Sequence, residues 1–236
     1  MGDSQIFECL VLKFAFEDIS QRSDIDEIPG KIISSIIEHG GILEYFDCEH
    51  VYAFFQSGYE NAMKCALSVI NELRKSHKLD IHASMSSGEA LATVIGGSIR
   101  SEGIIISKHK DIADKLNLLA QKFNCSLLAS EFACTGISVG SKEFSKRFIG
   151  KMTVAGVKAP VSVYEIIDCR LQEAMKKKTI KQFETGLRLF YDMKFEMAEK
   201  YFVDVIREHN NDLAAKYYYD KCEARGDEQI IREIAE

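Results

Sequence analysis

Residues 40–55 carry the sequence GGILEYFDCEHVYAFF, in which two apolar runs flank a short polar tip. Aromatic and β-branched residues on both sides of such a tip predict a β-hairpin. The tip consists of Asp47, Cys48, Glu49 and His50. Carboxylates at a hairpin tip are either solvated turn residues or ligands presented to a site. The remainder of the chain has to decide between these two interpretations.

Strand and helix patterns alternate along the chain on both sides of this hairpin. Short apolar or alternating runs predict strands at 7–16, 80–86, 91–95, 104–106, 125–129, 146–154 and 161–167. Gly88, Glu89 and Ala90 are expected to bend the strand at 80–86 into the strand at 91–95. Apolar residues at helical spacing predict helices within 24–39, 61–75 and 109–120. This order favours an α+β fold, an α/β sandwich in which helices pack on a ferredoxin-like mixed or antiparallel sheet.

The sequence changes character after Asp168, where strand signals end and polar, helix-prone segments begin. We therefore expect two units, 1–168 and an all-helical tail over 169–236. The tail shows the small-and-aromatic spacing of a tetratricopeptide-type helical hairpin, and a further repeat around Gly226 is incomplete; the matching residues are Gly186, Phe195, Ala198 and Phe202. One repeat cannot bury both of its faces, so the tail is expected to pack on the preceding domain or on a protein partner.

Composition excludes several classes of protein. Thirty basic and 36 acidic residues leave a net charge of -6, which argues against a nucleic-acid-binding protein. No apolar run reaches the roughly 20 residues of a membrane helix, so no membrane contact is expected. The seven cysteines lack paired CxxC spacing and the six histidines lack ligand spacing, so neither a disulfide framework nor a zinc site is expected. This cysteine usage favours a reducing, cytoplasmic environment.

Six segments, taken in order, resemble the catalytic domain of class III nucleotidyl cyclases, the adenylate and guanylate cyclases. The resemblance covers roughly residues 5–168 and implies the fold of that family. The matching segments are Phe16–Ile19, the hairpin Gly40–Phe55, Ser86–Glu89 with Val94–Gly96, Ile104–Leu116, Phe148–Gly150, and Val154–Glu165.

The resemblance also implies a site. The two metal-binding aspartates of the family, which hold two Mg²⁺ or Mn²⁺ ions, correspond to Asp18 and Glu49, and Asp47 takes the second place only if the tip is bulged. The family's base-reading positions fall on Tyr45, which carries no charge, and near Ile104, which offers no hydrogen bond.

The catalytic positions depart from the family pattern as well. The transition-state asparagine corresponds to Asp111, which places a negative charge where negative charge develops. The arginine four residues later corresponds to Lys115, which lacks the bidentate fork of a guanidinium. We therefore expect a catalytically degenerate, regulatory module that forms a homodimer, or a heterodimer with another cyclase-type domain. The alternative is an active cyclase that converts ATP or GTP to a 3',5'-cyclic nucleotide.

Each of these residues also has a simpler interpretation. Asp18 can cap the turn after its strand, and Asp111 and Lys115 can form an i,i+4 surface ion pair. The run 176–178, three lysines, is expected to be a solvated face. A third hypothesis is a scaffold that works only through its tail, in which case deletion from residue 176 onward leaves the core folded.

Overall fold

The computed structural model describes residues 4–97, 99–135, 143–169 and 174–224. Within them the strands form one mixed sheet in the order β2-β3-β1-β4-β6-β8-β7, with β5 paired to β4 beside this path. The strands are β1 (Gln5–Phe16), β2 (Ile42–Phe46), β3 (His50–Phe55), β4 (Ile81–Gly96), β5 (Ser101–Ile106), β6 (Leu127–Ser130), β7 (Phe144–Met152) and β8 (Val161–Asp168). The expected α+β sandwich is confirmed.

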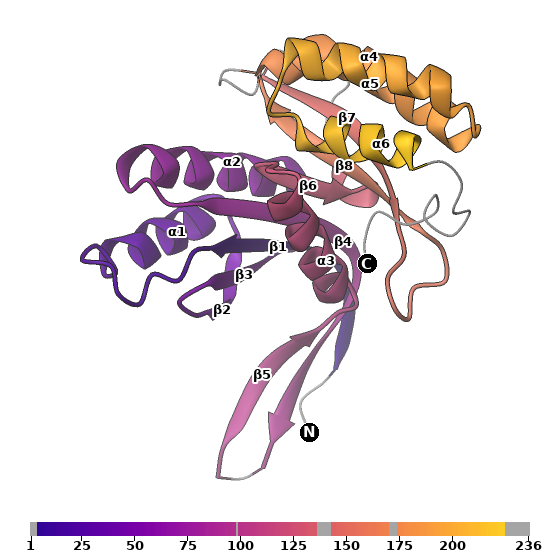
Figure 1. The fold of residues 1–236 in the computed structure, drawn as a ribbon. Helices are drawn as coiled ribbons and strands as arrows, with labels where there is room; N and C mark the ends of the chain where they lie inside the picture. The colour runs from indigo at the N-terminus through magenta and orange to yellow at the C-terminus, as the bar shows by residue number, and fades with distance from the viewer. Residues whose placement is uncertain (1–3, 98, 136–142, 170–173, 225–236) are drawn as a thin grey trace.

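Helices cover both faces of this sheet (Figure 1). They are α1 (Glu27–Glu38), α2 (Tyr59–Ser76), α3 (His109–Lys122), the short 3₁₀ helix η1 (Phe132–Cys134), α4 (Ala174–Tyr191), α5 (Phe195–Glu208) and α6 (Leu213–Glu223). Alternate residues of β1 point to opposite faces, as the period of a strand requires. Leu10 and Phe14 belong to the core under α1 and α2, and Cys9 and Val11 to a smaller cluster that includes Ala113 of α3.

The predicted hairpin at residues 40–55 is confirmed. β2 and β3 pair antiparallel, with Phe46 opposite Val51, and the register shifts by one residue between Leu43 and Tyr45. The irregularity therefore lies within β2, and the tip itself is a short turn closed by a hydrogen bond from the Asp47 N–H to the His50 carbonyl (2.9 Å).

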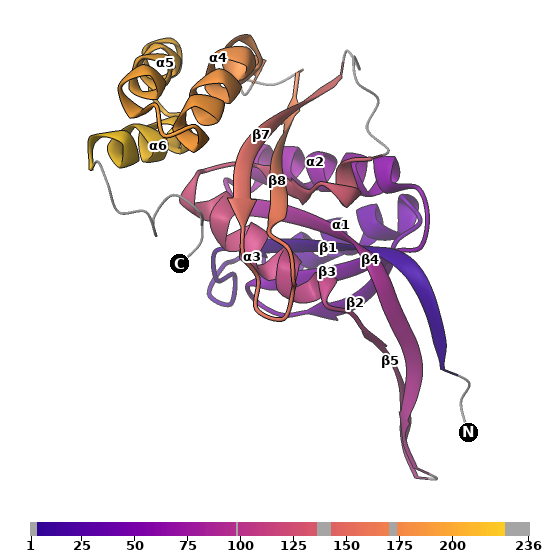
Figure 2. The same cartoon turned by 90° about the vertical axis from the view of Figure 1, so that its right-hand side faces the viewer.

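The strands expected at 80–86 and 91–95 form one continuous strand, β4, from Ile81 to Gly96, which curves away from the body along its length (Figure 2). Gly88 also permits a close contact between β4 and a helix. A Cβ atom at this position would lie 2.0 Å from Nε2 of His109, the first residue of α3. Glycine at position 88 therefore allows the start of α3 to rest directly on the sheet.

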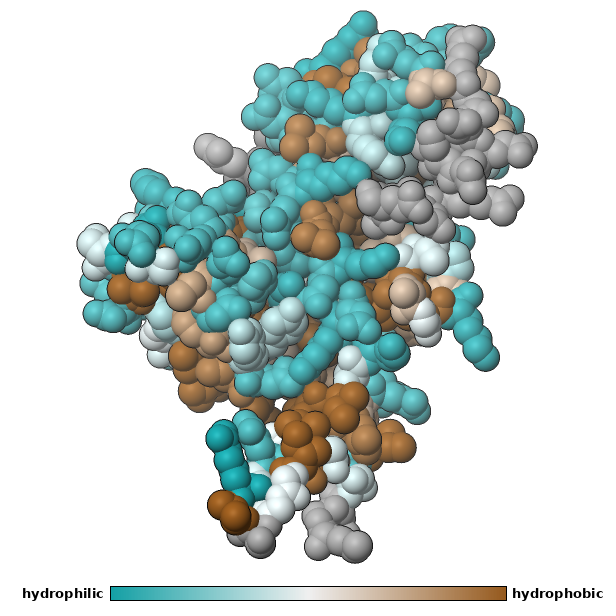
Figure 3. All heavy atoms as spheres, turned by 60° about the horizontal axis from the view of Figure 1, so that its bottom comes forward, coloured by the Kyte–Doolittle hydropathy of each residue, from teal (hydrophilic) through white to brown (hydrophobic). Residues whose placement is uncertain are grey.

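The outer half of β4, together with β5, projects from the body as a two-stranded arm beside the N-terminal end of β1 (Figures 1 and 2). Ile6 of β1 and Ile106 of β5 both lie opposite Leu91 of β4, so the three form one row across the strands. Large apolar side chains are exposed along this arm and on the adjoining end of β1; they are Val94, Ile95, Ile99 and Ile106 of the arm and Ile6 of β1. Figure 3 shows the apolar surface gathered on this projecting part of the molecule.

The helical tail packs on the preceding domain, one of the two arrangements that the sequence allowed. Its helices lie against β7 and β8 (Figure 2) and share a buried apolar cluster with α3. Members of that cluster include Leu116 of α3, Phe123 just after α3, Ile149 and Val163 of β7 and β8, and Phe183, Phe202 and Tyr218 of the tail. The boundary after residue 168 stays a prediction, and the incomplete repeat around Gly226 lies outside the described residues. None of the helices in the described ranges is long and apolar enough to span a lipid bilayer.

Candidate functional site

The hairpin tip is organised by the carboxylate of Asp47. Its Oδ1 accepts hydrogen bonds from the N–H groups of Glu49 (2.8 Å) and His50 (2.6 Å), and its Oδ2 accepts one from the Tyr45 hydroxyl (2.9 Å). Partial burial opposes ionisation, but these donors outweigh it and hold the pKa of Asp47 below its usual value. Asp47 is thus a turn-forming residue, while Cys48 at the tip is exposed.

Asp18 lies directly beside this tip. Two backbone hydrogen bonds join the end of β1 and the loop after it to the tip, from the Phe16 N–H to the Glu49 carbonyl (3.0 Å) and from the Ile19 N–H to the Cys48 carbonyl (3.1 Å). The Asp18 carboxylate accepts from the N–H (2.8 Å) and hydroxyl (3.0 Å) of Ser20, and these two bonds lower its pKa. The expected local turn interaction of Asp18 is therefore present.

Ion pairs and hydrogen bonds also hold the C-terminal part of the loop that follows β1. Arg22 donates to the carboxylates of Glu17 (2.8 Å) and Asp24 (2.9 Å), and Nδ1 of His77 lies 2.7 Å from Asp24. The hydrogen bonds from Arg22, then that of His77, hold the pKa of Asp24 far below its usual range. These contacts fix the backbone that carries Asp18 against the end of α2.

The donor set suits a hard divalent cation, since Asp18 and Glu49 are carboxylates on two adjoining loops. A carboxylate that accepts two hydrogen bonds keeps further lone pairs for a metal. No group of three or more histidine, cysteine, aspartate or glutamate side chains that could hold a metal occurs among the described residues, and a two-carboxylate site falls below that number. Asp18 and Glu49 as metal ligands stay a prediction.

The two positions that the family resemblance assigns to base reading lie on different parts of the sheet. Tyr45 is half exposed on β2, with its ring edge-on to Tyr52 (6.1 Å between centroids) and its hydroxyl bound to Asp47. Ile104 lies on the arm, in β5, opposite Thr93. Because β3, β1 and β4 separate β2 from β5, one chain does not bring these two positions together.

Asp111 and Lys115 of α3 do not form the expected ion pair with each other. Asp111 is exposed and lies 3.6 Å from Lys108, one turn earlier. The Lys115 ammonium donates to the backbone carbonyl of Thr153, just after β7 (3.2 Å). The spacing along the helix permitted the pair, but a carbonyl from a distant segment takes the lysine instead.

A polar cluster beside Tyr45 was not found from the sequence. The nearly buried Lys13 of β1 donates to Asp114 of α3 (2.7 Å), which also accepts from the Tyr52 hydroxyl (2.5 Å). A second ion pair, between Lys110 and Glu44, joins α3 to β2. These contacts attach α3 to the sheet edge that carries the hairpin. The only sequence signal was Lys13, a single charge in an otherwise apolar strand.

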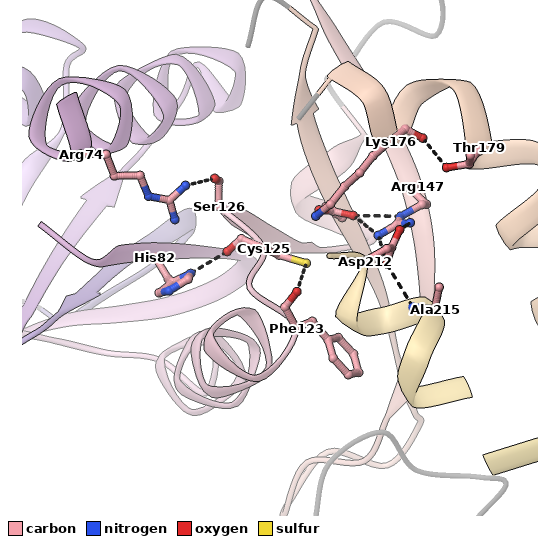
Figure 4. A network of polar contacts seen from close by, with 11 residues as sticks. Arg74, His82, Phe123, Cys125, Ser126, Arg147, Lys176, Thr179, Asp212 and Ala215 are labelled. Carbon is pink, nitrogen blue, oxygen red and sulfur yellow. Dashed lines mark hydrogen bonds and ion pairs between the residues drawn. The ribbon is translucent and has the colours of Figure 1, made fainter. Parts of the chain in front are cut away.

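A second missed cluster lies between the sheet and the tail (Figure 4). The Arg147 guanidinium contacts the carboxylates of Glu165 (2.6 Å) and Asp212, and the Lys176 ammonium donates to Glu165 (2.6 Å). All four side chains are buried. The expectation of a solvated face is therefore wrong for Lys176, whereas Lys177 and Lys178 are exposed. Burial raises the pKa of Glu165, but Arg147 and then Lys176 outweigh it and bring the pKa down to about 2.

Comparison with known proteins agrees with this geometry. A bacterial light-regulated adenylyl cyclase aligns over 70% of this chain and 52% of its own, with a TM-score of 0.58 and 17% identity. The adenylyl cyclase CyaB from P. aeruginosa aligns over 70% of this chain and 96% of its own (TM-score 0.55, 18% identity). The guanylate cyclase domain of RhGC from Catenaria anguillulae, solved with GTP, aligns over 70% and 98% (TM-score 0.54, 13% identity). The chain has the adenylyl and guanylyl cyclase fold.

Sequence similarity reaches beyond this cyclase fold. The terminal-differentiation-specific adenylate cyclase of Dictyostelium discoideum is 22% identical over 204 residues, which cover 80% of this chain. Residues 1–168 make up less than 80% of the chain, so the matched region extends into the helical tail. The chain spans about a tenth of that relative's length, as the match covers 10% of it. No model of a known protein family matches the sequence.

Proposed function

We propose that this chain is a class III cyclase homology domain of cyclic-nucleotide signalling that has lost catalysis and acts by pairing with a second cyclase-type domain, either its own copy or a different one. The cyclase fold and the similarity to a Dictyostelium adenylate cyclase support the family. The contacts of Lys115 and Asp111 on α3 support the loss of catalysis.

The environment of Lys115 carries this proposal. The family resemblance assigns Lys115 and Asp111 to the groups that stabilise the transition state. Lys115 is bound to the Thr153 carbonyl, and Asp111 presents a carboxylate at the surface. A cation already engaged by backbone and an anion in place of a neutral amide both oppose stabilisation of developing negative charge. Ile104, at a base-reading position, adds no polar atom.

The arm supports pairing. A two-stranded ribbon is only marginally stable in water by itself, and this one exposes about half of the Ile95 and Val94 side chains (52% and 51%) and all of Ile99. Exposed apolar surface of this kind marks an interaction site. A second cyclase-type domain that covers the arm would remove these side chains from water.

Sedimentation velocity on the intact chain tests the pairing. We expect a concentration-dependent dimer, or a complex with an added cyclase domain, that Ile95→Asp in the arm abolishes. Leu118→Asp, which alters an exposed leucine on α3, is the matched control and should leave the assembly intact. The proposal would be overturned if the chain remains monomeric with every cyclase domain offered. The concentrations should extend to the millimolar range, which is typical of very weak complexes.

One observation favours the alternative, an active cyclase. The loops that carry Asp18 and Glu49 are joined by backbone hydrogen bonds, so these two acidic residues lie on neighbouring backbone segments. In that case Asp18 and Glu49 would hold Mg²⁺ or Mn²⁺, which would neutralise a bound triphosphate and activate the ribose hydroxyl. Thermal unfolding with millimolar Mn²⁺ and ATP or GTP probes this site. A stabilisation that disappears in Asp18→Asn favours retained nucleotide binding, and an unchanged midpoint opposes it.

The tail is the second part of the proposal. A Cβ atom at Gly186 of α4 would lie 3.1 Å from atoms of Tyr201 and Phe202, so glycine lets α4 and α5 pack closely, as in a tetratricopeptide-type hairpin. Its outer face is then available to a protein partner. We further propose a reducing, cytoplasmic setting, which suits seven cysteines that are all free thiols.

A further inference from the structure

Four buried charges join the tail to the sheet, and each part supplies one cation and one anion. The sheet provides Arg147 from β7 and Glu165 from β8, and the tail provides Lys176 from α4 and Asp212, which precedes α6. Their side chains are between 0% and 4% exposed. In Figure 4 Arg147, Lys176 and Asp212 converge between the two parts.

Contacts within this network cross the boundary in both directions. Arg147 of the sheet contacts Asp212 of the tail, and Lys176 of the tail contacts Glu165 of the sheet. Asp212 also accepts a hydrogen bond from the N–H of Ala215 (3.0 Å), so the first turn of α6 is held by the same carboxylate. A shift of the tail by one helical turn would leave buried charges without partners, which is strongly unfavourable. The network therefore specifies one docked position.

The docked tail in turn contacts α3. The Tyr217 ring of α6 lies 5.4 Å from the Phe123 ring, between centroids, just after the end of α3. The Lys122 ammonium lies over the same Tyr217 ring, 4.8 Å from its centroid. The hydroxyl of the neighbouring Tyr218 donates to the Ile149 carbonyl in β7 (2.8 Å), which fixes α6 to the sheet. Thus α6 touches both β7 and the C-terminal end of α3.

We propose that the tail is an intramolecular clamp on α3. The four-charge network sets where the tail docks, and Tyr217 transmits that position to the helix that carries Asp111 and Lys115. A protein that binds the tail and displaces α6 removes the Tyr217 contact and thereby loosens the C-terminal end of α3. The proposal concerns the conformation of this chain and holds whether or not the chain has catalytic activity.

Hydrogen–deuterium exchange of the intact 236-residue chain tests the first step. Lys176→Met removes the buried ammonium and keeps most of the side-chain volume, and Lys177→Met on the exposed side of the same helix is the matched control. We expect exchange about tenfold faster in α4–α6 and in the second half of α3 for Lys176→Met, and no change for the control. Faster exchange in the tail with unchanged α3 overturns the clamp, and so does an equal response to both substitutions.

Tyr217→Leu tests the second step and leaves the charge network in place. It removes the ring that contacts Phe123 and Lys122, so exchange should rise in the second half of α3 while α4 and α5 remain protected. Tyr219→Leu is its control, because the Tyr219 hydroxyl bonds within its own helix to Glu223 (2.8 Å). Unchanged α3 exchange in Tyr217→Leu refutes the transmission step even if Lys176→Met fails to fold.

Discussion

Replacement of Glu165 by glutamine measures the strength of the junction between sheet and tail. Glu165 is fully buried and contacts both Arg147 and Lys176. Removal of one partner from a buried ion pair typically costs about 3–5 kcal/mol, because the remaining charge stays buried without compensation. The lowered pKa of Glu165, about 2, agrees in direction, because Arg147 and Lys176 stabilise the charged carboxylate in the folded chain. We expect Glu165→Gln to lower the unfolding free energy by about 3 kcal/mol, or the midpoint temperature by roughly 10 °C.

The pH dependence of this loss has a defined direction. Because the pKa of Glu165 is lower in the folded chain than in the unfolded chain, its stabilisation is complete above about pH 4.5 and is lost as the pH falls through 2. Urea unfolding followed by far-UV circular dichroism should show the full difference between Glu165→Gln and wild type at pH 7. The two proteins should converge near pH 2.

Glu208→Gln, on the exposed side of α5, is the control and should change stability by less than about 0.5 kcal/mol. A loss below about 1 kcal/mol in Glu165→Gln at pH 7, or a difference that does not shrink in acid, would refute the account of this network.

Three further substitutions probe other parts of the fold. Gly88→Ala should destabilise the chain by about 1–3 kcal/mol because its Cβ meets the His109 ring, and His109→Ala in the same chain should recover most of that loss in thermal unfolding. Deletion of residues 169–236 should yield a product without a cooperative unfolding transition, since it uncovers the apolar cluster on β7 and β8; a stable truncated core would instead support independent units. Asp47→Ala should cost about 1 kcal/mol by releasing the tip N–H groups of Glu49 and His50, whereas Asp47→Asn, which keeps an acceptor oxygen, should cost less.

The sequence was sufficient for elements whose own residues determine them. The hairpin at residues 40–55 and the buried strand β1 follow from local periodicity, and the structure confirms both. A glycine within a strand signals either a bend or a close neighbour, and the sequence did not identify the close neighbour of Gly88, which is His109, 21 residues later.

Long-range polar contacts could not be derived from local patterns. Arg147 and Asp212 are 65 residues apart, and Lys176 occurs in a run of lysines that resembles an ordinary solvated face. Only the packing of the tail on β7 and β8 makes these charges partners. The same limit applies to Lys115, whose spacing from Asp111 was correct for an ion pair but whose ammonium is bound by Thr153. At the candidate site, the family resemblance associated Asp18 with the hairpin tip but did not reveal the hydrogen bonds that Asp18 and Asp47 accept.

Turnover is the property that tests the proposed loss of catalysis most directly. The purified intact chain is incubated with Mn²⁺ and either ATP or GTP, and 3',5'-cyclic nucleotide is quantified by mass spectrometry. A parallel reaction contains an excess of the Ile95→Asp chain, which is not expected to pair, as the control for pairing. The environments of Lys115, Asp111 and Ile104 predict no product above that of heat-denatured protein. Cyclic nucleotide that accumulates with the wild-type chain and is lost in Asp18→Asn would contradict the account and establish an active cyclase.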